Sequence, residues 1–108
     1  MDTVLQAIAE PRRREILRLI VDAELSAGEI ASHFDVTRPA ISQHLKVLTD
    51  AGLITMRREG TRRLYRARPE GVAEVRSFLN AFWSEGLLAL KQAAETEERR
   101  INKRVSKR

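Results

Sequence analysis

The sequence predicts a mainly helical α+β domain with four helices, one small β-hairpin and a last helix, in the order αααα-ββ-α. Three observations support this fold class. Apolar residues recur at helical spacing before Gly52, and prolines divide them into short segments. The spacing changes to an alternating, strand-like pattern at Ile54. It returns to a helical one near Pro69 and stays helical over a wide apolar face.

The first two predicted helices meet at a proline. The first carries apolar residues at helical spacing, namely Val4, Leu5 and Ile8. It ends at Glu10, because the residue before Pro11 is pushed out of the α region. That proline suits the first turn of the second helix, whose apolar stripe is Ile16, Leu17, Leu19 and Ile20. Arginines at positions 12–14 crowd a turn where the helix dipole disfavours cations, so we expect them to have another role.

Capping residues mark the next two helices. Ser26 followed by Glu29 has capping-box spacing, and it predicts a short third helix over Ile30, Ala31 and Phe34. Thr37 can cap a fourth helix that carries Pro39 in its first turn and ends at Gly52 as a left-handed cap. The apolar face of this fourth helix is Ile41, Leu45 and Leu48. Two short helices joined by a tight turn are typical of a helix-turn-helix.

Two strand-like runs follow, over residues 54–58 and 62–67, and they are joined through Glu59, Gly60 and Thr61. This pattern predicts a hairpin with an arginine-rich tip. A hairpin placed directly after a helix-turn-helix predicts the winged helix-turn-helix fold.

The last predicted helix begins near Pro69 or Glu70 and has an unusually wide apolar face. A domain this small cannot easily hide that face by itself, so we expect a symmetric homodimer joined through the first and last helices. The predicted dimer interface is Val4, Leu5, Ile8, Phe78, Phe82, Trp83, Leu87 and Leu90. The alternative is that these aromatic residues belong to an ordinary intramolecular core.

The 108-residue chain has a net charge of +5, which is unevenly distributed. Residues 36–68 carry +6 and the last ten carry +6, whereas residues 1–35 carry −3 and residues 69–98 carry −4. We expect one domain over 1–98 and a basic tail over 99–108, which the pattern leaves open as a helical extension or a disordered end. The absence of cysteine excludes disulfides, thiolate metal sites and thiol redox sensing. With no long apolar run and no leader, a cytoplasmic protein without membrane contact is expected.

The fourth helix carries the side chains that a DNA-reading helix needs. Such a helix buries an apolar face and presents hydrogen-bonding groups to the major groove. Candidate DNA-binding residues here are Thr37, Arg38, Pro39, Ser42, Gln43, His44 and Lys46. Gln43 can pair with adenine, and Arg38 or Lys46 can contact guanine or a phosphate. Any one of them alone is better explained as a solvated surface residue, so the prediction depends on the adjacent hairpin.

The hairpin provides a second group of candidate DNA-binding residues: Arg57, Arg58, Thr61, Arg62 and Arg63. A projecting loop with several guanidinium groups can follow phosphates or enter a minor groove. The alternative is an edge hairpin kept soluble by its charge. Acidic residues are nearly absent from this segment, which favours DNA as the partner.

Nothing in the sequence favours an enzyme. There is no glycine-rich phosphate loop and no pairing of histidine and carboxylate at a catalytic spacing. His33 and His44 have no matching ligands, so neither a metal site nor a cofactor is predicted.

Four segments, over residues 9–17, 38–48, 51–54 and 57–65, resemble the ArsR family of bacterial repressors, and the similarity covers about residues 4–92. The resemblance implies a winged-helix dimer joined through its first and last helices, with repression relieved by an effector. The chain departs from metal-sensing members in two places. Some members have a Cys-x-Cys motif where Ser26, Ala27 and Gly28 stand here, and others have Asp and His ligands on the last helix, where this chain has no histidine. Its last helix, with Trp83, is similar to a metal-independent branch.

The function expected from these observations is sequence-specific regulation of transcription. The homodimer would bind a palindromic DNA operator, most simply as a repressor, and an unidentified non-thiol effector, such as a small molecule, would release it. Repression and activation are not distinguished by the sequence. The competing interpretations are a winged-helix protein-docking module and a nonspecific nucleic-acid binder that acts mainly through the basic tail.

Overall fold

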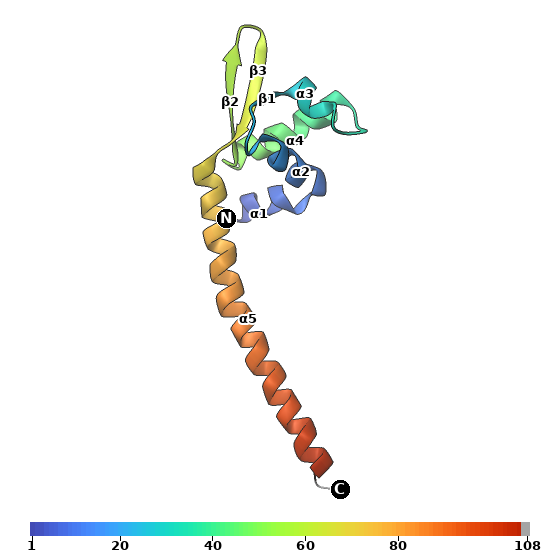
Figure 1. The fold of residues 1–108 in the computed structure, drawn as a ribbon, viewed down its shortest axis with the longest axis vertical. Helices are drawn as coiled ribbons and strands as arrows, with labels where there is room; N and C mark the ends of the chain where they lie inside the picture. The colour runs from blue at the N-terminus through green and yellow to red at the C-terminus, as the bar shows by residue number, and fades with distance from the viewer. Residues whose placement is uncertain (107–108) are drawn as a thin grey trace. The chain divides into compact units, whose positions relative to one another are not determined.

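The computed structural model describes residues 1–106 and divides the chain into two compact units, residues 1–75 and the chain from Arg76 onward. The elements are α1 (Asp2–Ala9), α2 (Pro11–Ile20), β1 (Leu25–Ser26), α3 (Ala27–Ala31), α4 (Arg38–Asp50), β2 (Ile54–Glu59), β3 (Arg62–Ala67) and α5 (Pro69–Ser106) (Figure 1). The predicted order of helices and hairpin is confirmed, and a short strand is added before α3. Among the described residues, no helix is both long and apolar enough to cross a bilayer.

The core of the first unit comes from the apolar positions that face inward on its helices. Ile16 and Ile20 of α2, Ile30 of α3 and the predicted face of α4 are all fully buried, and Leu53 and Ile54 join them from the start of β2. Leu17 and Leu19 lie at the edge of this core and are half-buried. Burial of aliphatic side chains from α2, α3 and the start of the hairpin therefore holds α4 in a defined position.

The predicted helix caps are present. The Ser26 side chain accepts from the Glu29 backbone and the Glu29 carboxylate accepts from the Ser26 backbone, both at 3.1 Å, which completes the capping box. Thr37 Oγ1 accepts from the Ala40 backbone at 3.3 Å. Gly52 adopts the left-handed conformation, with φ +75°, directly after α4. These local contacts define where the two helices of the helix-turn-helix begin and where the second ends.

The third helix is shorter than predicted. It ends at Ala31, and Phe34 lies beyond it in a half-buried turn. The backbone amides of His33 and Phe34 donate to carbonyls three residues earlier, at 3.0 and 3.1 Å, so the chain tightens and leaves the α-helical pattern. Phe34 is half-buried although it lies in the turn, so apolar spacing alone predicts a longer helix than the structure has.

Two of the arginines at the start of α2 cap the preceding helix. Arg13 Nε donates to the Ala7 carbonyl at 2.6 Å, and its Nη2 donates to the Gln6 carbonyl at 3.1 Å. Arg14 Nη1 donates to the carbonyls of Ile8 and Ala9 at 2.8 and 3.0 Å. The last carbonyls of a helix lack intrahelical partners and attract cations. The structure therefore gives Arg13 and Arg14 a role in stabilising the end of α1.

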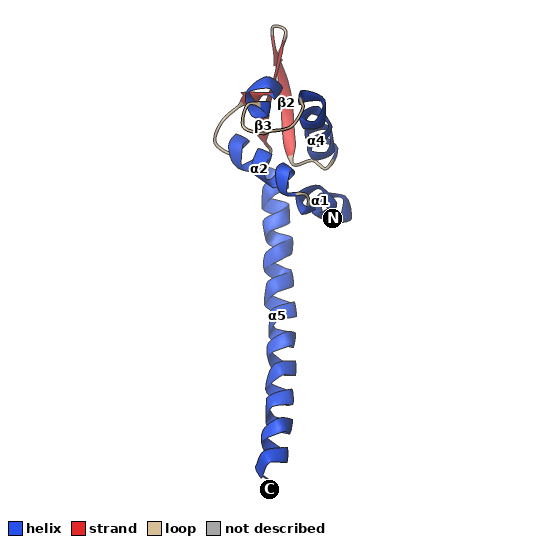
Figure 2. Cartoon of the chain, turned by 90° about the vertical axis from the view of Figure 1, so that its right-hand side faces the viewer, coloured by secondary structure: helices blue, strands red, loops and turns tan. Residues whose placement is uncertain are grey.

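The strands form one antiparallel sheet in the order β1-β3-β2, shown in red in Figure 2. Leu25 pairs with Tyr65 and Ser26 with Leu64, which attaches the start of α3 to the hairpin. A strand of two residues has too few positions to show an alternating pattern, so sequence periodicity could not predict it. The tip of the hairpin extends past the helices of the first unit in both views (Figures 1 and 2).

The last helix begins at Pro69, as predicted, and continues through Ser106. The basic tail is thus a helical extension as far as Ser106, and Lys107 and Arg108 lie outside the described residues. The predicted domain division at residue 98 falls inside this helix and stays a prediction.

At Gly71, the start of α5 lies close against the backbone of Gly52 in the turn after α4. A Cβ added at this position would lie 2.2 Å from the backbone carbonyl oxygen of Gly52. We expect Gly71→Ala to lower the free energy of unfolding by about 1–3 kcal/mol, because backbone atoms must move to admit the methyl group. Thermal or urea unfolding measures this change.

Gly28→Ala is the matched control, since its added Cβ would have no contact closer than 3.8 Å. Equal stability of the two variants would show that the turn yields freely to the added methyl group.

Candidate nucleic-acid interface

Helix α4 separates its side chains into a buried face and a polar face. Ile41, Leu45 and Leu48 are at most 1% exposed and hold the helix on the core. Six of the predicted DNA-binding residues are exposed: Thr37, Arg38, Pro39, Ser42, Gln43 and Lys46. Between Asp35 and Asp50 the chain has no acidic residue, so the exposed face of α4 offers cations and neutral hydrogen-bonding groups.

His44 lies differently from the other candidates on α4. It is half-buried, and its Nδ1 is 3.4 Å from Arg13 Nη1 of α2. Its assignment to DNA contact stays a prediction, whereas the contact with Arg13 connects α4 to the arginine that caps α1. Among residues 1–106 no group of three histidine, cysteine, aspartate or glutamate side chains is arranged to hold a metal ion.

The hairpin residues are arranged by the register of β2 and β3. Arg58 lies opposite Arg63, Arg57 opposite Leu64, and Glu59 opposite Arg62. Directly opposed residues share a face of a sheet, and neighbours along a strand point to opposite faces. Arg58 and Arg63 therefore share one face of the hairpin.

Arg57 and Arg62 share the other face, and both are held there by glutamates. Arg57 Nε donates to both carboxylate oxygens of Glu24 at 2.8 Å, and its Nη2 lies 3.1 Å from Glu59 Oε2. Arg62 pairs with Glu29, the capping-box glutamate in α3. Hydrogen bonds from Arg57 lower the pKa of Glu24, and those from Ser26 lower the pKa of Glu29, so both carboxylates are charged at neutral pH.

These ion pairs correct one inference from the sequence. The hairpin segment has few acids of its own, but Glu24 and Glu29, each 33 positions from its arginine, supply the missing negative charge. The spacing of Ser26 and Glu29 indicates the start of a helix, but nothing in the sequence indicates that Glu29 also pairs with Arg62.

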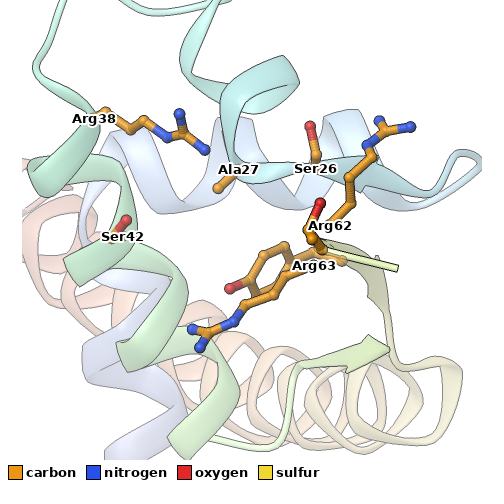
Figure 3. A pocket seen from close by; sticks show the side chains of 8 residues that line it. Ser26, Ala27, Arg38, Ser42, Arg62 and Arg63 are labelled. Carbon is orange, nitrogen blue, oxygen red and sulfur yellow. The ribbon is translucent and has the colours of Figure 1, made fainter. Parts of the chain in front are cut away.

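Arg58 and Arg63 have no ion pair within residues 1–106. Arg63 borders two hollows on the side of the sheet that faces α4. One, of about 430 Å³, is lined by Ser26, Ala27, Arg38, Ser42, Thr61, Arg62, Arg63 and Tyr65. The other, of about 350 Å³, is lined by Ser42, Leu45, Lys46, Thr49, Asp50, Met56, Arg63 and Tyr65. Figure 3 shows the side chains of Arg62 and Arg63 leaving the strand in opposite directions.

The first hollow lies between candidate DNA-binding residues of α4 and those of the hairpin. Arg38 and Ser42 of α4 lie on one side, and Arg63 lies across from them (Figure 3). The Arg38 guanidinium also lies close to α3, where its Cζ would be 3.8 Å from a Cβ on Gly28. The polar face of α4 and the hairpin thus present cations to the same hollow, which suits a polyanion.

The predicted dimer residues fall into two groups. In α1, Val4, Leu5 and Ile8 are half-buried. In α5, five predicted residues are exposed: Phe78, Phe82, Trp83, Leu87 and Leu90. The rings of Phe82 and Trp83 meet edge to face, with centroids 5.8 Å apart. The dimer assignment stays a prediction. Leu88, which was not among the candidates, is also exposed.

Comparison with known proteins places these features in a family. Residues 10–56, from the cap of α2 into β2, match the profile described as bacterial regulatory protein, arsR family. The chain is similar to the HTH-type transcriptional regulator Rv2034 of Mycobacterium tuberculosis, with 42% identity over 89% of this chain and 90% of that protein. It is 43% identical to the transcriptional repressor SdpR of Bacillus subtilis, over 56% of this chain and 67% of that protein.

A solved structure has the same fold. It is described as the homodimeric winged helix-turn-helix DNA-binding domain of Mb0332 from Mycobacterium bovis, a possible ArsR-family transcriptional regulator. The similarity covers 78% of each chain at 33% identity, with a TM-score of 0.64. The predicted winged helix-turn-helix is thereby confirmed.

Proposed function

Because this chain belongs to the ArsR family of bacterial regulatory proteins, we propose that it is a transcriptional repressor that binds operator DNA as a homodimer. It acts by binding and not as an enzyme. The observation that carries the proposal is the basic surface formed by the polar face of α4 and the Arg58–Arg63 face of the hairpin. Such a regulator works where the bacterial chromosome is, so we place it in the cytoplasm.

In this proposal α4 enters the major groove. The buried leucines and isoleucine of α4 fix its orientation, so that Ser42, Gln43 and Lys46 reach the base edges or phosphates together. Gln43 has the donor and acceptor needed for adenine, and Arg38 or Lys46 can contact guanine or a phosphate. The hairpin follows the adjacent backbone through Arg58, Arg63 and Thr61.

Two-fold symmetry would double these contacts. A homodimer places two copies of α4 about one DNA turn apart, roughly 34 Å, and so matches a palindromic operator. The exposed apolar residues of α5 and the half-buried ones of α1 supply the surface for this contact. The homodimeric description of the Mb0332 domain supports the same assembly here.

Release from DNA requires an effector that does not depend on thiols, since the chain has no cysteine. At the start of α3, Ser26 and Glu29 are engaged in the capping box. We therefore propose a small molecule as effector and no metal at this position.

The direct test compares binding of the purified protein to its own upstream promoter region and to unrelated DNA of equal length, by fluorescence anisotropy across a salt series. A specific repressor should discriminate by a hundredfold or more, about 3 kcal/mol. Equal affinity with a steep salt dependence would favour a nonspecific binder. No binding at low salt would overturn the proposal and favour a protein-docking module.

The basic tail over residues 99–108 provides a separate prediction. Its cations are Arg99, Arg100, Lys103, Arg104, Lys107 and Arg108. Deleting the tail should weaken binding to all DNA by about tenfold at low salt, because fewer phosphates are neutralised. The ratio of operator to unrelated affinity should stay the same in the anisotropy assay. A loss of that ratio would show that the tail takes part in sequence recognition.

A further inference from the structure

Four of the hairpin's five arginines lie near its tip, and the surroundings of these four differ by face. On one face, Arg57 and Arg62 are neutralised by Glu24, Glu29 and Glu59. On the other face, Arg58 stands directly opposite Arg63. Within residues 1–106 neither of these two has an ion pair. Like charges in directly opposed positions destabilise a sheet. The second face therefore carries an electrostatic cost that an anion would relieve.

The location of the Arg58–Arg63 face indicates which molecule supplies that anion. Arg63 lines both hollows beside α4, together with Ser42, and Lys46 lines one of them. An anion that contacts Arg63 is thus next to the polar face of the helix proposed to enter the major groove. A DNA backbone phosphate has the charge and the acceptor oxygens for paired guanidinium groups.

The paired face connects the hairpin to the helix-turn-helix. Glu24 directly precedes β1, and Glu29 lies in α3. Both are exposed enough that their ion pairs add little to stability. They do fix two arginines in place, and Arg57 reaches Glu24 with three of its contacts between 2.6 and 2.8 Å. A phosphate that approached either arginine would also meet the neighbouring carboxylate, whose negative charge opposes its binding.

We propose that the two faces of the hairpin have separate roles in DNA binding: Arg58 and Arg63 contact the DNA backbone, whereas Arg57 and Arg62 are positioning residues that hold the hairpin against α3 and β1 through Glu24 and Glu29. The proposal rests on the proposed DNA-binding function and divides it among the arginines. It predicts that Arg58 and Arg63 contribute to the salt dependence of binding, whereas Arg57 and Arg62 do not.

The salt dependence separates the two roles. Each phosphate contact contributes about 0.9 to the slope of log affinity against log salt on duplex DNA. Arg58→Gln and Arg63→Gln should each reduce the slope by about 0.9 per protomer. The double variant Glu24→Gln/Arg57→Gln is made in a Glu59→Gln background, so that neither partner carboxylate of Arg57 is left unpaired, and it should leave the slope of that background unchanged. Equal reductions in all three would overturn the proposal.

A charge exchange tests positioning directly. In a Glu59→Gln background, which removes the third charge near Arg57, the variant Glu24→Arg/Arg57→Glu keeps the ion pair in reverse. Its affinity and slope should match those of Glu59→Gln alone. If Arg57 itself contacts a phosphate, the exchange should weaken binding at least about tenfold, because a carboxylate would then face the DNA.

These slopes are measured on operator DNA and on an unrelated duplex, since phosphate contacts do not depend on sequence. Failure of the wild-type chain to discriminate the two DNAs would overturn the proposed repressor function but leave the comparison of arginines intact. Absence of any duplex binding at low salt would overturn both proposals.

Discussion

Replacing Leu90 by glutamate is expected to convert the proposed dimer into monomers and to weaken operator binding by at least about a hundredfold. Leu90 is 66% exposed in the isolated chain, and on a helical projection it shares a stripe with Trp83 and Leu87. A charge in the core of a symmetric interface is buried twice without a partner. Each monomer would then bind its half-site alone, without the higher affinity that comes from linking two DNA-binding sites in one dimer.

Sedimentation velocity and anisotropy on the operator measure the two effects together. Leu88→Glu is the matched control: Leu88 is 55% exposed on the same helix, but two positions from Leu90 it faces nearly the opposite way. The control should stay dimeric. A dimeric Leu90→Glu variant would place the interface elsewhere. A monomeric one with normal operator affinity would mean that the two half-sites are not read together.

The second large effect is expected for Leu48→Ala in α4. Leu48 is fully buried, and its carbonyl accepts from the Leu53 backbone at 3.1 Å, where the chain turns into β2. Removing the buried side chain should lower the free energy of unfolding by about 2–5 kcal/mol, through lost burial and the cavity left behind. For a domain of this size, each kcal/mol shifts the melting temperature by about 4–8 °C.

Calorimetry or thermal circular dichroism at a fixed protein concentration measures this loss, since dimerisation couples stability to concentration. Val47→Ala is the control, because the neighbouring Val47 is 37% exposed and should lose far less. At temperatures where the Leu48→Ala variant remains folded, its operator affinity should stay close to that of the wild type. Equal destabilisation by both substitutions would contradict the assigned orientation of α4.

Much of the fold is predictable from local signals. Caps at Ser26 and Thr37, the proline at the start of α2 and the glycine after α4 each act within one helical turn, so their effects can be recognised in the sequence. The exposed polar face of α4 follows from helical periodicity in the same way. The sequence predicts that α3 extends to Phe34, but the helix ends at Ala31, because an apolar side chain in a turn gives the same spacing as one in a helix.

Other features depend on residues far apart in the chain. Arg13 and Arg14 were recognised as misplaced for a helix start, but their carbonyl partners on α1 follow only from how the two helices meet. Strand β1 is defined by its partner β3 and has no pattern of its own. Both require tertiary contact before they can be identified.

The order of the elements, the helix-turn-helix, the polar face of α4 and the excess of positive charge over residues 36–68 all follow from the amino-acid sequence alone. Which hairpin arginines are neutralised and which are available depends on the folded arrangement of the chain. Charge composition is a local sum, whereas pairing Arg57 with Glu24 and Arg62 with Glu29 depends on β1, β3 and α3 meeting in space. Two residues of equal charge on adjacent positions can therefore differ in role, because strand alternation points them to opposite faces.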